Sequence, residues 1–226
     1  ISNKNGSYCE LTAMYWAWKN IKKIYPNLYY IGLSHYRRLF DFNHPYAIQD
    51  KYIYNENNII DYKTDVHSLL SILDKYDVIT TKRKYYSYPI YIDYCINHIS
   101  DDFRILRHII SEKTPEYSDT FNKVLMENNA FAPYNMNIIR WETFNDYCTW
   151  LFYILAETEK QINISNYNAV QKRIFGYMAE RLWNVYFIKH KLKAKHLPIS
   201  LYINDIHTTP LSVQKHQVEL KHGCSC

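Results

Sequence analysis

A histidine, a tyrosine and two adjacent arginines follow a short apolar run near the start of the sequence. The polar group is His35-Tyr36-Arg37-Arg38, and the run before it predicts a strand over residues 28–34 that is buried on both faces. Ligands of open α/β sheets bind at the carboxyl ends of such strands. Guanidinium groups are fork-shaped donors for phosphate or carboxylate. The pattern therefore indicates a site for an anionic, phosphorylated ligand, the alternative being arginines that are solvated or paired with surface carboxylates.

The elements that must position these side chains alternate between helices and strands. The residue pattern favours an α/β domain, with Ser7 and Glu10 forming a capping box before the first helix. The polar stretch 41–63 is long for a compact domain, and is expected to be a functional loop or partly mobile. Helices are expected over 9–24, 65–74, 89–98, 101–111, 114–128, 141–159 and 167–190, and further strands over 76–80, 136–139 and 195–200.

Composition limits the class of protein. With 47% hydrophobic residues in 226, the chain can bury a sizeable core as one domain over residues 1–205, followed by a tail over 206–226. A formal charge of +5 without a basic stripe argues against a nucleic-acid partner. Five cysteines without metal or disulfide spacing fit a reducing cytoplasm. No apolar run reaches the roughly 18 residues of a membrane span.

Short motifs stand in a fixed order along nearly the whole chain. They are Asn3-Lys4-Asn5, Tyr8-Cys9-Glu10-Leu11-Thr12, Tyr15-Trp16-Ala17-Trp18-Lys19-Asn20, Ile31-Gly32-Leu33-Ser34-His35-Tyr36-Arg37-Arg38, Tyr76-Asp77-Val78-Ile79, Tyr94 with His98, Tyr134-Asn135-Met136, Phe144 with Tyr147-Cys148 and Trp150-Leu151-Phe152, Arg173 with Phe175-Gly176-Tyr177, and Glu180-Arg181-Leu182. This set resembles a bacterial family found in capsular polysaccharide and exopolysaccharide clusters. The family was long described as a domain of unknown function and is regarded as glycosyltransferases.

The resemblance implies a helix-rich, Rossmann-like α/β fold of the GT-A type that uses nucleotide-sugar donors. Because the sequence begins at Ile1, its first strand is expected to be missing. Most GT-A enzymes hold a divalent metal on the diphosphate with an Asp-x-Asp pair, and His35-Tyr36-Arg37-Arg38 stands where that pair is expected. We therefore expect a metal-independent site in which the arginines stabilise the leaving diphosphate. No resident cofactor is predicted, and His35 with Asp41 is the pair that could still hold Mn²⁺ or Mg²⁺.

Two carboxylates are candidates for the base that deprotonates an acceptor hydroxyl. Glu180 lies in an otherwise apolar helix, where a carboxylate is costly unless it is paired or functional. Its alternative role is an ion pair with Arg38, Arg173 or Arg181. Asp41 is the second candidate, and its alternative role is to cap a loop.

The remaining candidates are assigned by the resemblance. His35, Tyr36, Lys4 and Asn5 join Arg37 and Arg38 at the donor diphosphate, and Asn135, His98, Glu10 and Arg173 face the donor sugar or acceptor. The alternatives are a capping-box role for Glu10, a solvated Lys4, a turn role for Asn135 and a cationic helix cap for His98.

The sequence thus predicts a cytoplasmic glycosyltransferase that builds surface polysaccharide. It would transfer a hexose-type sugar, with galactofuranose as one candidate, from a UDP-linked donor to a growing glycan or lipid-linked acceptor. Basic and aromatic residues 82–86 would contact the inner membrane face or form a plain solvated loop. The enzymatic alternative is a different nucleotide-dependent transferase, such as a sugar-phosphate transferase. The non-enzymatic alternative is a non-catalytic glycan-binding or scaffold module of a polysaccharide assembly complex.

Overall fold

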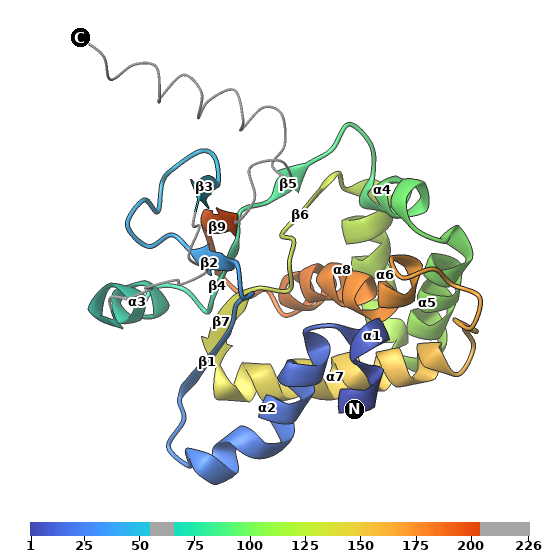
Figure 1. Cartoon of the computed structure of the whole chain (residues 1–226), viewed down its shortest axis with the longest axis horizontal. Coiled ribbons are helices and arrows are strands. Elements are labelled where there is room, and N and C mark those ends of the chain that lie inside the picture. Colours follow the sequence, from blue (N-terminus) through green and yellow to red (C-terminus); the bar gives the residue numbers. More distant parts are fainter. Residues whose placement is uncertain (55–65, 204–226) are drawn as a thin grey trace.

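The computed structural model of the chain, which describes residues 1–54 and 66–203, combines strands with a larger group of helices (Figure 1). The main sheet has four strands in the order β1-β7-β4-β8 within this described part. β7 is antiparallel to both of its neighbours, whereas β8 is parallel to β4. These strands are β1 (Tyr30–Leu33), β7 (Asn137–Arg140), β4 (Val78–Thr81) and β8 (Ala194–Leu197).

Two smaller sheets adjoin the main one. The strand β9 pairs with β2 on one side, antiparallel, and with β3 on the other side, parallel. The strands β5 and β6 form an antiparallel pair. Their bounds are β2 (Arg38–Phe40), β9 (Ile199–Ile203), β3 (Lys51–Tyr54), β5 (Lys84–Tyr85) and β6 (Ala130–Phe131).

The helices lie mainly on one side of the strands, and α3 lies on the other (Figure 1). This mixture of helices and mixed sheet confirms the predicted α/β class. The helices are α1 (Asn5–Tyr8), α2 (Leu11–Ile24), α3 (Val66–Leu73), α4 (Ile90–Asn97), α5 (Ser100–Lys113), α6 (Ser118–Phe121), α7 (Trp141–Glu159) and α8 (Ile174–Lys189), with a π-helical turn over Asn122–Glu127 and 3₁₀ turns over Ser2–Lys4, Pro115–Tyr117 and Gln171–Arg173. None of the described helices is both long and apolar enough to cross a bilayer.

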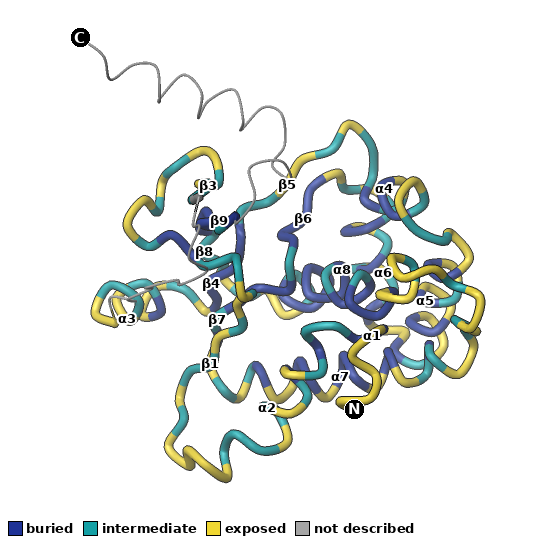
Figure 2. Tube along the Cα trace, viewed as in Figure 1, coloured by how far each residue is buried: buried dark blue, intermediate teal, exposed yellow. Residues whose placement is uncertain are grey.

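The strand β4 is buried on both faces, since all of its residues from Val78 to Thr81 are buried. Val78 belongs to the large core shared with the helices, and Ile79 to a smaller core that includes Leu73 of α3. Successive side chains of a strand point to opposite faces, so one short run serves both cores. In Figure 2 β4 lies at the junction of the sheet and the helical group.

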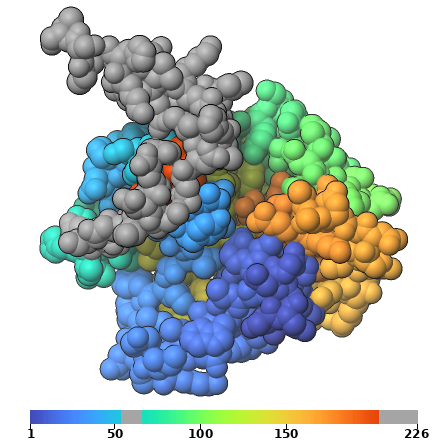
Figure 3. All heavy atoms as spheres, in the orientation of Figure 1, coloured from blue at the N-terminus to red at the C-terminus, as the bar shows by residue number. Residues whose placement is uncertain are grey.

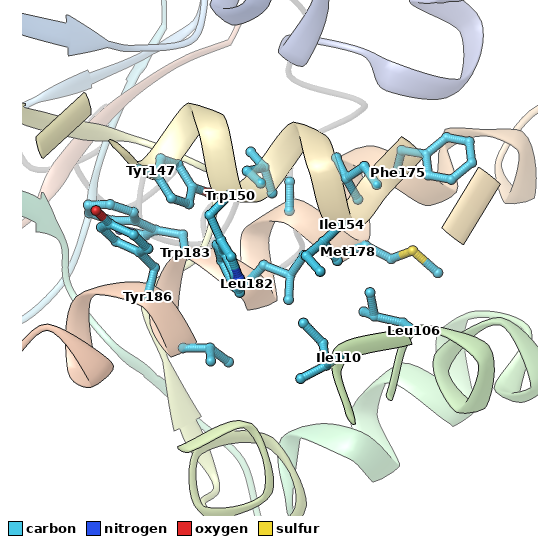
Figure 4. Close-up of a cluster of buried hydrophobic side chains, with 14 of the residues drawn as sticks. Leu106, Ile110, Tyr147, Trp150, Ile154, Phe175, Met178, Leu182, Trp183 and Tyr186 are labelled. Carbon is cyan, nitrogen blue, oxygen red and sulfur yellow. The ribbon is translucent and has the colours of Figure 1, made fainter. Parts of the chain in front are cut away.

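The large core is formed mainly between α5, α7 and α8 (Figure 4). Trp183 of α8 is fully buried, and its indole N–H donates to the Thr80 hydroxyl at 3.1 Å. This bond satisfies the indole inside the core and ties α8 to β4. The labelled side chains are Leu106 and Ile110 of α5, Tyr147, Trp150 and Ile154 of α7, and Phe175, Met178, Leu182, Trp183 and Tyr186 of α8.

The strand β1 differs from the prediction. We expected it to be central and buried on both faces, but it is an edge strand of the sheet whose residues are exposed or half-buried. Its single neighbour is β7, and Gly32 lies against Ile138 so closely that a Cβ there would be 3.1 Å from Ile138 Cγ1. The apolar run therefore reflects packing against one neighbour rather than a central position.

The predicted capping box is also absent. Ser7 lies within α1, and its hydroxyl donates to the carbonyl of Lys4 at 3.2 Å. Helix α2 begins at Leu11, and the side chain of Glu10 makes no capping bond. Ser7 lies in α1 and Glu10 directly precedes α2, so the two residues do not belong to the start of one helix. The side chain of Glu10 can therefore contact another part of the chain.

The polar stretch 41–63 contains β3, which the sequence pattern does not predict. This segment is a strand because it pairs in parallel with β9, which lies about 150 residues further along the chain. Residues 55–63 of the stretch and the expected tail over 206–226 lie outside the described residues.

Candidate active site

The loop between β6 and β7 forms the centre of the candidate site. Tyr134 has a φ of 77° and Asn135 a φ of 53°, both in the left-handed region. This conformation is unusual for a bulky residue such as tyrosine, so the surrounding structure must impose it. The Thr81 hydroxyl donates to the carbonyl of Pro133 at 2.8 Å, and that of Thr80 to the carbonyl of Met136 at 3.0 Å. The strained pair is thus fixed on both sides by β4.

Asn184 of α8 holds the same loop from the helical side. Its amide oxygen accepts the backbone N–H of Ala132 at 2.8 Å, and its amide nitrogen donates to the carbonyl of Ala132 at 2.9 Å. The same nitrogen also donates to the carbonyl of Glu180 at 2.8 Å. One buried side chain therefore fixes the loop relative to the helix turn that carries Glu180.

Glu180 lies against this loop. Its Oε1 accepts the backbone N–H of Tyr134 at 3.1 Å, and its side chain is 20% exposed. The nearest cation is Arg181, whose Nη1 is 3.9 Å from Oε2, but that guanidinium pairs more closely with Asp93 at 3.0 Å. Glu180 therefore does not form the close ion pair with an arginine that was its alternative role.

The surroundings of Glu180 raise its pKa above the ordinary glutamate value. Burial is the main cause and the negative charge of Glu10 adds to it, whereas Arg181, the N–H of Tyr134 and Lys84 act in the opposite direction. A carboxylate whose pKa is raised toward neutrality is a better proton acceptor for a hydroxyl group. The direction of this shift favours a role as a general base.

Asn135 connects Glu10 to the same loop. Its Nδ2 donates to Glu10 Oε1 at 2.7 Å and to the carbonyl of Gly176 at 3.2 Å, which fixes the orientation of the amide. Its Oδ1 is buried and has no hydrogen-bond partner among the described residues. A buried acceptor without a donor is costly, so a ligand hydroxyl at this position would satisfy it.

Cations surround the ring of Tyr134. The guanidinium carbon of Arg38 lies 4.5 Å from the ring centroid, and Lys84 Nζ lies 4.7 Å from it and donates to the phenol oxygen at 2.6 Å. Burial alone would lower the pKa of Lys84, but contact with Tyr134 outweighs it and the pKa is raised. Lys84 therefore carries its charge at neutral pH, beside Arg38.

His35 orients Arg38 within this group. Its Nδ1 accepts from Arg38 Nη1 at 3.4 Å, so its Nε2 carries the proton and donates to the carbonyl of Tyr134 at 2.6 Å. Arg38 Nε is buried without a partner among the described residues. We call the residues that meet at this loop the Tyr134 cluster: Glu10, His35, Arg38, Lys84, Tyr134, Asn135 and Glu180.

Arg37 and Arg38 do not lie side by side. Arg37 is half-buried, and its guanidinium carbon is 4.9 Å from the ring centroid of Tyr36, which is 77% exposed. Neither arginine forms an ion pair with a carboxylate among residues 1–54 and 66–203. Tyr36 and Arg37 form the turn between His35 and Arg38, whose backbones pair, and of the two arginines Arg38 is the one that lies over Tyr134.

Three other predicted residues lie in local networks elsewhere. Asp41 is 7% exposed and accepts the backbone N–H groups of Asn43 and His44, which is its alternative role as a loop cap. Lys4 Nζ pairs with Glu159 at 2.7 Å, at the carboxyl end of α7. Asn5 Oδ1 accepts from the Thr12 hydroxyl at 3.1 Å.

The predicted metal pair does not form a site. Both ring nitrogens of His35 are engaged, and the carboxylate of Asp41 is bound to backbone N–H groups and to the His44 ring, 3.0 Å away. No three metal-ligating side chains gather anywhere in the described ranges. These residues therefore do not fit a metal as they are arranged, and we derive no step through one.

His98 and Arg173 lie around Tyr177, one turn before Glu180. The His98 ring stacks on the Tyr177 ring with centroids 4.0 Å apart. Arg173 Nε donates to Cys9 Sγ at 3.3 Å, and its guanidinium carbon is 5.8 Å from the Tyr177 centroid. Burial and the charge of Arg181 lower the pKa of His98 to about 4. His98 stands at the C-cap position of α4, as its alternative role requires, but the lowered pKa favours a neutral imidazole there at physiological pH.

We expect the ring of His98 to titrate with a midpoint near pH 4 in the folded protein, measured by NMR with His98→Gln to assign its signal. In urea the same ring should titrate near 6.5. Because the unfolded chain then binds the proton more tightly, His98 destabilises the fold as the pH drops from 6.5 toward 4 and has no effect above that range. A folded-state midpoint at or above 6.5 would contradict the assigned burial.

Asn135 offers a test of the loop conformation. Asn135→Ala removes the bonds to Glu10 and Gly176 and strains the left-handed backbone, so we expect a loss of about 2–3 kcal/mol in the free energy of unfolding. Asn135→Gly removes the same bonds without the strain and should cost about 1 kcal/mol less. Urea unfolding measures both. Equal losses would show that the positive φ is not adopted in solution.

Three members of this arrangement are not predicted from the sequence. Tyr134 was noted only as part of a motif, Lys84 only as one of the basic residues 82–86, and Asn184 not at all. Pro133 before Tyr134-Asn135 was an available signal for a turn. Lys84 is held by Tyr134, and the nearby Lys82 Nζ by the carbonyl of Ala47. Their contacts favour a structural or ligand role for this stretch over the expected membrane surface.

A solved structure described as the apo form of WbbM, a bifunctional glycosyltransferase, has a similar fold. The two chains are 31% identical, with a TM-score of 0.79. The alignment covers 90% of this chain and 38% of the WbbM chain, so this chain spans less than half the length of that protein. No curated protein sequence matches the chain.

The family comparison covers most of the sequence. The model described as Domain of unknown function (DUF4422) matches residues 1–191, which include every member of the Tyr134 cluster and every strand except β8 and β9. In Figure 3 the blue amino-terminal segment and the orange segment leading into α8 adjoin on one face, and both fall within the match. The chain belongs to the DUF4422 family.

Proposed function

We propose that this protein is a glycosyltransferase whose reaction centre is the Tyr134 cluster. The observation that carries the proposal is the meeting of a base-like carboxylate, Glu180, with two unpartnered buried groups, Arg38 Nε and Asn135 Oδ1, around one strained loop. The likeness to WbbM supports the reaction class, since that protein is described as a glycosyltransferase.

Each member of the cluster has a role in the proposed reaction. Arg38 and Lys84 bind the diphosphate of the nucleotide sugar and offset the negative charge that develops as its bond to the sugar breaks. Asn135 Oδ1 accepts a sugar hydroxyl, and Glu10 fixes the Asn135 amide. Glu180 removes the proton of the acceptor hydroxyl. The hydroxyl oxygen bonds to the anomeric carbon of the sugar as the bond from that carbon to the diphosphate breaks. This single displacement inverts the configuration at that carbon.

The substrates are proposed from the motif resemblance. They are a UDP-linked donor of a hexose-type sugar, with galactofuranose as one candidate, and a growing surface glycan or lipid-linked acceptor. A panel of UDP-sugars tests this, with thermal stabilisation and release of UDP as readouts. We expect one donor to stabilise the protein and to be hydrolysed slowly without acceptor. A scaffold or glycan-binding module would show neither effect.

We further propose that the diphosphate is held by cations of the chain rather than by a metal ion. The support is the arrangement of Arg38 and Lys84 on Tyr134, together with the engagement of both nitrogens of His35. Transfer in excess chelator is then expected to keep its rate within about twofold. Loss of activity in chelator that manganese restores would contradict this part of the proposal and leave the reaction class standing.

A further inference from the structure

A hollow of about 440 Å³ lies over α5 and α6, outside the Tyr134 cluster. Figure 1 places α5 beyond α8, on the side away from β1 and β2. The floor of the hollow is apolar, and the other residues that line the hollow are basic or neutral polar. The lining residues are Arg104, Arg107, His108, Ile110, Ser111, Ser118, Phe121 and Asn122.

The basic side of the hollow comes from one face of α5. Arg104, Arg107, His108 and Ser111 follow at intervals of three, one and three residues, so their side chains share that face. No carboxylate of the described residues lines the hollow. The nearest acidic partners are Asp101, which pairs with Arg104 at 2.8 Å, and Glu112, which contacts Lys113 at 2.8 Å and His108 at 3.6 Å.

Two groups in the hollow are available to a ligand. Arg107 Nε donates to Asn122 Oδ1 at 3.0 Å, which fixes the guanidinium, and no described carboxylate lies within 4.0 Å of it. The hydroxyl oxygen of Ser118 is buried and has no partner in the described part of the chain. The Arg104–Asp101 pair is exposed on both sides, at 71% and 67%, so it is weak and its arginine can turn to another anion.

We propose that this hollow is a second anion site that binds a phosphate ester group. A held guanidinium, a second arginine within one helix turn and a buried hydroxyl are the donors that a tetrahedral oxyanion requires. The apolar floor of Ile110 and Phe121 would accommodate the organic part of the ester. The phosphate belongs either to a lipid headgroup or to a soluble phosphorylated molecule, and both present the same group to these donors.

Titration of the full chain with inorganic phosphate, followed by NMR of the Arg107 Nε–H signal, tests the site directly. We expect a saturable shift at this signal, and an affinity about tenfold lower in Arg107→Ala, which is followed by the side-chain amide signals of Asn122 in the same hollow. Ser118→Ala should also weaken phosphate binding while leaving the thermal midpoint unchanged or higher, because it removes an unsatisfied buried hydroxyl. Arg140→Ala, which removes an exposed arginine from the end of β7, is the matched control and should bind phosphate normally.

Vesicles distinguish the two sources of the phosphate group. Phosphatidylcholine vesicles with and without phosphatidylglycerol are compared, using the same variants. Binding only to the anionic vesicles, weakened in Arg107→Ala, identifies a lipid headgroup, whereas phosphate binding without vesicle binding identifies a soluble ester. Failure of both probes, or binding that Arg107→Ala and Ser118→Ala leave intact, overturns the proposal. UDP binding is measured in parallel, so that failure of this site is distinguished from failure of the Tyr134 cluster.

Discussion

Glu180→Gln is expected to lower the rate of sugar transfer by about 10³-fold, because it removes the base and retains the shape of the side chain. The amide oxygen can still accept the N–H of Tyr134, so the loop should keep its position. UDP affinity should change by less than about twofold, since Glu180 does not contact the proposed diphosphate site. The measurements are kcat and KM for transfer and the dissociation constant of UDP.

The matched control is Glu142→Gln, which neutralises an exposed carboxylate in the first turn of α7. We expect it to transfer sugar at the wild-type rate. Thermal unfolding should show Glu180→Gln to be at least as stable as the wild type, because the burial that raises the pKa of Glu180 also disfavours its charge. Transfer by Glu180→Gln within about threefold of wild type would exclude Glu180 as the base.

The pH profile gives an independent readout of the same assignment. Glu180 acts as a base only when it is ionised, so kcat/KM should rise with pH through its pKa, which lies above the usual glutamate value of 4.5. Glu10→Gln removes a negative charge that raises this pKa, and the amide can still accept from Asn135. The acidic limb should therefore shift to lower pH in Glu10→Gln. An unchanged limb would mean that the two carboxylates do not interact.

The sequence predicts the helical part of the fold well. The helix expected over 141–159 is α7, and α8 lies within the range expected for the last helix. Their apolar residues repeat at helical spacing because they pack in the core, where Trp183 and Tyr147 are almost fully buried. β4 was found for a similar reason, since both of its faces are buried. Burial of a whole face leaves a periodic pattern that can be read locally.

The other parts of the fold and of the candidate site depend on contacts between residues that are distant in the sequence. Such contacts leave no periodic pattern of apolar residues. β3 is a strand because β9 lies beside it, and β1 is an edge strand because β7 covers only one of its sides. In the candidate site, Arg38 and Glu180 were predicted from residue type and Asn135 from the family resemblance, but Tyr134 and Lys84 were not predicted. Their importance comes from a backbone conformation and a tertiary hydrogen bond that only the folded chain reveals.

Arg38→Ala is expected to weaken UDP binding about tenfold and to lower transfer by about 10³-fold. The larger effect on rate follows because charge on the leaving diphosphate grows in the transition state, where a preorganised cation contributes most. The substitution removes the guanidinium side chain and keeps the backbone pairing of β2 with β9. Calorimetric titration with UDP and steady-state kinetics separate the two effects.

Two further variants test what the arginine pair contributes. Arg38→Lys separates the charge of Arg38 from the shape of its guanidinium, and Arg37→Ala tests whether Arg37 contributes to the reaction. Lysine keeps the charge but lacks the fork and the buried Nε, so Arg38→Lys should recover UDP binding and little of the rate. Arg37 rests on the exposed ring of Tyr36 and not on Tyr134, so Arg37→Ala should lose less than about fivefold in rate. Equal, large losses in Arg37→Ala and Arg38→Ala would instead mean that both guanidinium groups bind one diphosphate, as the sequence alone suggests. If neither variant loses activity, the diphosphate lies elsewhere, and the unpartnered Nε of Arg38 has another cause.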